Sequence, residues 1–136
     1  MAEVEVHHDS AEDLVLAAIG LGRIVWGATT VLAPSRVHGA LGVAYPGPDQ
    51  GIWIRAFGVR DVVLGAAALH PHAAVRRATL HAGIMMDLFD AGVVLLAAQQ
   101  GLPRRASAVG VLLAGGTAAL ATSGPAMVRK FSHRGR

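Results

Sequence analysis

A run of 23 residues near the C-terminus, ASAVGVLLAGGTAALATSGPAMV at positions 106–128, contains no charged side chain. A helix needs about 20 apolar residues to cross the hydrocarbon core of a bilayer. The run also places small residues at every fourth position, and such a ridge lets membrane helices approach closely; its members are Ala106, Gly110, Ala114, Ala118 and Thr122. This stretch predicts a membrane-spanning helix.

The composition of the whole chain agrees with that prediction. Of 136 residues, 53% are apolar and only 15% are charged, whereas about a quarter of the residues in a soluble domain are charged. A disordered tail and a collagen-like repeat are excluded by the apolar content. The absence of cysteine excludes disulfides, thiolate metal sites and a cysteine nucleophile.

Four apolar segments are predicted to be helices, at about 11–33, 51–69, 74–100 and 103–123. The first is expected to begin after Ser10, which has capping-box spacing with Asp13, and to end at Pro34. The others end at His70-Pro71-His72, at Gly101 and at Gly124-Pro125; a short interfacial turn is expected within 35–44. The predicted fold is all-α, a four-transmembrane-helix bundle at 11–124 between an acidic tail at 1–10 and a basic tail at 125–136.

Charged residues interrupt the first three segments. Each costs about 2.5–3.5 kcal/mol at the centre of a bilayer, so the second segment should not insert alone. The positive and negative charges in these segments are equal in number. Three arginines, Arg23, Arg55 and Arg60, are matched by three aspartates, Asp61, Asp87 and Asp90. A bundle that pairs them would carry no net charge in lipid. The alternative is a very apolar soluble bundle, but the first and fourth segments lack its continuous polar face.

Basic residues in the loops and tails predict the orientation. If four segments span the membrane, one side holds the N-terminus, the loop with Arg76 and Arg77, and the C-terminal tail. That side has six basic residues, and the other side has three. The positive-inside rule then places both termini in the cytoplasm, in a multi-pass protein of the inner (plasma) membrane. No removable signal peptide is predicted, because the N-terminus lacks a basic region and a cleavage site. A basic tail after an apolar run favours a membrane surface over nucleic acid.

The intramembrane charges are the candidate ligand-binding residues, because ionisable groups at membrane depth often line a functional polar pocket. Asp87 and Asp90 share one face of their helix, whereas Arg60 and Asp61 point about 100° apart and need partners on other helices. The full set is Arg23, Arg55, Arg60, Asp61, Asp87 and Asp90. The alternative is that they are static ion pairs, and asparagine at Asp61 or Asp87 would then leave an arginine unpaired.

Other chemistry has little support in the sequence. His81 lies on a different face from Asp87 and Asp90, so the third segment does not offer the i,i+3 or i,i+4 spacing of a helical metal site, and no metal is predicted. Neither a phosphate-binding glycine motif nor a G-x-S-x-G nucleophile is present. The sequence indicates no cofactor, and the spacing of its charged residues does not point to a particular reaction.

Several of these residues resemble a known group. Arg23, Pro34, Arg55, Phe57-Gly58-x-Arg60-Asp61, Gly65, Asp87 and Asp90 are similar to the pattern of small four-helix bacterial membrane proteins of unknown function, the broad DoxX-like group. The resemblance covers roughly 14–123 and implies the four-helix fold. The size is also similar to that of small multidrug transporters, but these carry an essential Glu in the first helix, where this chain has Arg23.

The leading functional hypothesis is a membrane-embedded pocket for a small amphiphile such as a quinone, an isoprenoid or a lipid. The three arginines would meet its polar end, and their positive charge would favour an anionic or carbonyl-bearing head group. One alternative is an accessory or scaffold subunit that docks a partner membrane subunit, or a second copy, through the Ala/Gly ridge. Another is a small transporter, or an enzyme acting on a lipid-soluble substrate. In every case the surroundings are a lipid bilayer.

Overall fold

The structure is a computed structural model that describes the backbone of residues 2–132 and the side chains of 13–49, 51–120 and 122–123. Over residues 2–132 every regular element is a helix, which confirms the all-α prediction. The helices are α1 (Ala2–Leu32), α2 (Pro34–Leu41), α3 (Pro48–Ala68), α4 (Ala73–Gln99) and α5 (Arg104–Ser132).

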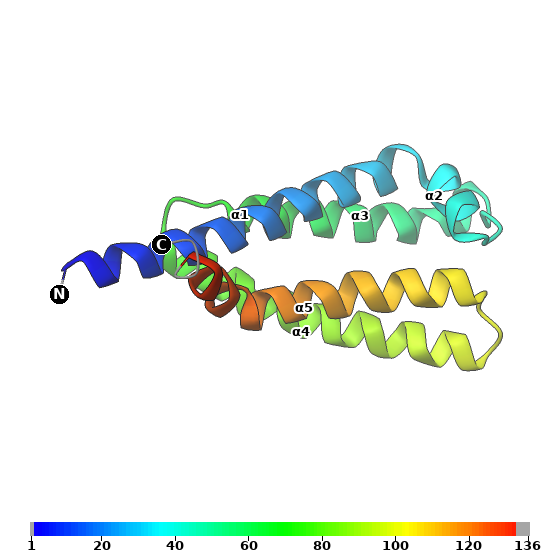
Figure 1. Cartoon of the computed structure of the whole chain (residues 1–136). Coiled ribbons are helices and arrows are strands. Elements are labelled where there is room, and N and C mark those ends of the chain that lie inside the picture. The colour runs from blue at the N-terminus through cyan, green and yellow to red at the C-terminus, as the bar shows by residue number, and fades with distance from the viewer. Residues whose placement is uncertain (1, 133–136) are drawn as a thin grey trace.

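The four long helices run alternately up and down, as Figure 1 shows. α1 packs most extensively on α3, and α4 on α5, while α1 also contacts α5 and α3 contacts α4. Each long helix therefore has two long neighbours. The short helix α2 lies at the same end of the molecule as the α4–α5 loop, and the N-terminus and the α3–α4 loop lie at the other end.

α2 fills the expected interfacial turn. Pro34 occupies its first turn, where the missing amide hydrogen costs nothing. Gly42 ends it in the left-handed conformation, with φ of 72°, which glycine adopts without steric cost. The chain thereby reverses direction between α1 and α3 within a short distance.

Two expected helix boundaries are wrong. α1 begins at Ala2 rather than after Ser10, because no glycine or proline interrupts residues 2–10 and a helix can continue through them. The acidic stretch 1–10 is therefore largely part of α1 and not a separate tail.

At the other end, α5 continues through Gly124 and Pro125 to Ser132. Proline removes one helical hydrogen bond and kinks a helix without always ending it. The last turns, red in Figure 1, bend away from the axis of the rest of α5. The predicted basic tail 125–136 is thus helical up to Ser132, and its side chains lie outside the described residues.

Paired glycines bring α1 and α3 into backbone contact. A Cβ atom at Gly20 would lie 2.9 Å from the carbonyl oxygen of Gly65, and one at Gly58 would lie 2.7 Å from the carbonyl oxygen of Gly27. In both helices the two glycines are seven residues apart, so they lie on one face. Larger side chains at these positions would separate the two helices.

Two helices are long and apolar enough to cross a membrane, over Asp13–Leu32 and Ala73–Gln99. Within the described residues, α3 does not meet this criterion. The predicted span 106–128 extends beyond the side chains that the structure describes, so only its first part can be compared.

Polar and apolar side chains are distributed in an unusual way. Arg23, Asp61 and Asp87 are among the most buried residues, at 9%, 9% and 6% exposure. Large apolar side chains are instead exposed on all four long helices, among them Val25, Phe57, Phe89 and Leu112. A water-soluble domain has the opposite arrangement.

Candidate functional site

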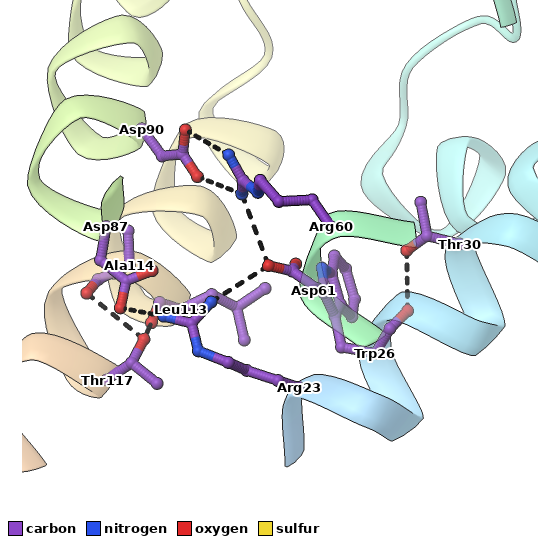
Figure 2. Close-up of polar contacts among 10 residues, drawn as sticks. All are labelled: Arg23, Trp26, Thr30, Arg60, Asp61, Asp87, Asp90, Leu113, Ala114 and Thr117. Carbon is purple, nitrogen blue, oxygen red and sulfur yellow. Dashed lines mark hydrogen bonds and ion pairs between the residues drawn. The ribbon is translucent and has the colours of Figure 1, made fainter. Parts of the chain in front are cut away.

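Arg23 joins three helices through its guanidinium group. From α1 it donates Nη1–H to Oδ1 of Asp61 on α3 at 3.0 Å and Nη2–H to Oδ2 of Asp87 on α4 at 2.6 Å. All three side chains are buried. Figure 2 shows Arg23 between the two carboxylates. Gly83, one turn before Asp87, also faces this guanidinium, since a Cβ there would lie in ordinary contact with it, 3.4 Å from Nη2.

Arg60 extends the network on the side of α3 and α4. It holds Asp90 through both terminal nitrogens, at 2.7 and 3.4 Å, and reaches the Oδ1 atom of Asp61 at 3.4 Å. Adjacent Arg60 and Asp61 thus contact each other only weakly, and each has a closer partner on another helix, as their angular separation predicted. We call the five residues Arg23, Arg60, Asp61, Asp87 and Asp90 the charge cluster.

Arg55 lies outside the charge cluster. Its side chain is exposed, and within the described residues it forms no ion pair. Five helical residues rotate the chain by about 140° relative to Arg60, which turns Arg55 away from that face. The expected balance of three arginines and three aspartates is therefore wrong. The cluster holds two arginines and three aspartates, for a formal charge of −1 when all are ionised.

The cluster also contradicts the expectation that losing Asp61 or Asp87 would leave an arginine unpaired. Arg23 contacts Asp61 and Asp87, and Arg60 contacts Asp90 and Asp61. If any one aspartate is removed, each arginine still has a carboxylate of its own. Each arginine is shared, however, and the loss of Arg23 would leave two buried carboxylates without their closest cation.

A small cavity adjoins the buried part of the cluster. Its volume is about 10 Å³, close to the least that holds a single water molecule. The polar residues that line it are Arg23, Asp87, Thr79 and Thr117, among apolar neighbours such as Leu16 and Leu80. An amphiphile does not fit in this space, so Arg23 and Asp87 are not placed to contact one through it.

Arg60 and Asp90, which we call the edge pair, lie at the accessible side of the cluster. Their side chains are 22% and 37% exposed, against 7% for Asp87. The guanidinium group of Arg60 lies 5.2 Å from the ring centre of Phe57, and the neighbouring Phe89 is 69% exposed. A hydrogen-bonding pair is therefore accessible from outside within an apolar surface. The Nε atom of Arg60 is buried and has no partner within the described part of the chain.

Thr117 is a cavity residue that the sequence analysis did not identify. Its hydroxyl donates to the carbonyl oxygen of Leu113 in the preceding turn of α5, and Figure 2 places it beside Asp87 and Arg23. It is the one residue between 108 and 121 with a polar side chain. A lone polar residue in an apolar helix is a signal from which Thr117 could have been identified as a candidate site residue.

The small-residue ridge of α5 packs within the fold. Ala106 and Ala114 are buried, and a Cβ at Gly110 would lie 3.0 Å from methyl groups of Val94 on α4. These three positions of the ridge therefore serve contacts inside the chain. His81 is exposed and away from the cavity.

Comparison with protein families, curated proteins and solved structures finds no match to the chain.

Proposed function

We propose that the protein is an integral membrane protein with four spanning helices, as the resemblance to the DoxX-like group also implies. The observation that supports this is the exposure of large apolar side chains on all four long helices around a charged interior. In α1 the segment 14–32 contains one charged residue, the buried Arg23, and its length suits a bilayer core. α3 would then enter the membrane together with its partners, because its residues Arg60 and Asp61 are paired with charges on α4 and α1.

We propose further that the protein binds a small amphiphile, such as a quinone, an isoprenoid or a lipid, at the edge pair. The supporting observation is that Arg60 and Asp90 are the accessible members of the charge cluster and that Arg60 lies beside the exposed ring of Phe57. Arg60 offers hydrogen-bond donors and Asp90 offers acceptors. A neutral head group with carbonyl or hydroxyl oxygens can use both, while its apolar part lies along the helices in lipid.

The net charge changes the preferred ligand. An arginine-rich site would favour an anion, but the cluster has an excess of carboxylate. An anionic head group would also have to compete with Asp90 for Arg60, so a neutral one is the better occupant whether or not the cluster carries a proton. The scaffold alternative is less favoured, because the buried part of the α5 ridge is already used within the chain.

Ligand titration of the protein in nanodiscs tests the proposal. The informative variant is the double substitution Arg60→Gln with Asp90→Asn, which removes the edge pair and leaves the formal charge of the cluster unchanged. Arg55→Gln is the matched control, because Arg55 is an exposed arginine on the same helix and lies outside the cluster.

A quinone analogue should bind at least about tenfold more weakly to the double variant, since a hydrogen bond to a charged group contributes about 1.5–3 kcal/mol. Arg55→Gln should bind as the unmodified protein does. Equal affinity in the double variant would overturn the proposed site, and tighter binding of a lipophilic cation than of the quinone analogue would favour a transporter.

A further inference from the structure

The charge cluster has one carboxylate more than its guanidinium groups can neutralise. Asp61, Asp87 and Asp90 contribute three negative charges, and Arg23 and Arg60 contribute two positive ones. Arg23, Asp61 and Asp87 are at least nine-tenths buried. An uncompensated charge is strongly disfavoured at such a position, and a buried carboxylate usually responds by taking up a proton.

We propose that the charge cluster is a proton-binding site, with one exchangeable proton carried by the carboxyl group of Asp87. Protonation of this group leaves two separate one-to-one ion pairs, Arg23 with Asp61 and Arg60 with Asp90. The cluster is then neutral. The inference depends on the ion pairs and their burial, and it holds whether or not an amphiphile binds at the edge pair.

The geometry favours Asp87 over the other two aspartates. Asp61 accepts hydrogen bonds from both arginines, at 3.0 and 3.4 Å, so its protonation would weaken both. Asp90 is held by two nitrogens of Arg60 and is the most exposed of the three. Within the part of the chain whose side chains are described, Asp87 has a single ion-pair contact, to Arg23.

Asp87 is also the aspartate that lines the cavity. A single water molecule in that space could pass a proton to its carboxyl group. The groups that face Asp87 are Arg23 from α1, Asp61 from α3 with Arg60 beyond it, and Thr117 from α5. Thr79 and Asp90 lie on the same helix as Asp87. Among the described side chains, Arg23 is the one cation that forms an ion pair with Asp87, and Asp61 already shares that cation.

Infrared spectroscopy of the full chain in nanodiscs of zwitterionic lipid tests the proposal, because a protonated carboxyl group has a carbonyl band distinct from that of a carboxylate. At neutral pH the unmodified protein should show one such band. Asp87→Asn should abolish it, since the remaining two arginines and two aspartates balance. Asp87→Glu should shift the band, and Asp90→Glu should leave it in place.

Asp49→Asn is the matched control, because Asp49 is exposed in the first turn of α3 and its substitution should leave the band unchanged. Absence of a protonated-carboxyl band from the unmodified protein would overturn the proposal. A band that persists in Asp87→Asn, or that moves in Asp90→Glu and not in Asp87→Glu, would overturn the assignment to Asp87. The measurement on the unmodified protein and on Asp87→Glu decides the question even if Asp87→Asn does not fold.

Discussion

Gly20 of α1 and Gly65 of α3 face each other backbone to backbone. A Cβ on Gly20 would lie 2.9 Å from the carbonyl oxygen of Gly65, and a Cβ on Gly65 would lie 2.5 Å from the carbonyl oxygen of Gly20. The second pair, Gly27 and Gly58, repeats the contact two turns away. This close approach holds α1 against α3 at the distance from which Arg23 reaches Asp61.

Substitution of Gly65 by alanine should destabilise the protein. The added methyl group would meet backbone that cannot move independently, and overpacking of this kind costs about 1–3 kcal/mol. Gly22→Ala is the control, because a Cβ at Gly22 meets nothing within 4 Å outside its own helix. Thermal unfolding in detergent measures both. A lower midpoint for Gly22→Ala than for Gly65→Ala would contradict the packing described for α1 and α3.

Loss of Arg23 should be far more damaging than loss of any one aspartate of the charge cluster. Arg23→Gln leaves Asp61 and Asp87 buried without their shared cation, and breaking a buried pair in this way costs about 3–5 kcal/mol. Asp61→Asn or Asp87→Asn leaves every arginine with a carboxylate, so each should cost no more than about 1–2 kcal/mol.

Unfolding midpoints of the three variants measure this asymmetry. Arg55→Gln, which changes an exposed arginine, should unfold like the unmodified protein. If an aspartate variant is as unstable as Arg23→Gln, the sharing of carboxylates between Arg23 and Arg60 is not what stabilises the cluster.

The protein should remain with membranes after a carbonate wash and should require detergent for extraction. The physical reason is the apolar surface of α1, α3, α4 and α5, which water would solvate poorly. Fractionation followed by immunoblotting measures this. Recovery of a monodisperse protein in buffer without detergent would contradict the membrane proposal.

Both termini should report the same compartment, and the basic residues of the loops and tails place that compartment in the cytoplasm. The first part of this statement follows from the proposed four spans, and the second follows from the excess of Lys and Arg on that side under the positive-inside rule. Fusions of alkaline phosphatase and of a fluorescent protein to each terminus measure it. Opposite signals from the two ends would show that one long helix does not span.

Much of the helical organisation follows from the sequence alone. Pro34, Pro71 and Gly101 interrupt the apolar segments, and proline and glycine act locally on the backbone, so the ends of α1 and α3 and the beginning of α4 lie close to where they were predicted. Local signals predicted the wrong helix end at two places. α1 continues past the expected start at Ser10, and α5 continues past the expected end at Pro125. The small-residue ridge of α5 was also recognisable, because helical spacing alone places its members on one face.

The composition of the charge cluster was decided by tertiary structure. The sequence supplies six charges of balanced sign within its apolar segments, but the rotation of α3 set by Gly58 and Gly65 turns Asp61 inward and leaves Arg55 outside. The partner choice of Arg23 depends on side chains that lie 38 and 64 residues away in the chain. Helical periodicity fixes which residues share a face, whereas the packing of one helix against another fixes which faces meet, and that packing alone left the cluster with one carboxylate in excess.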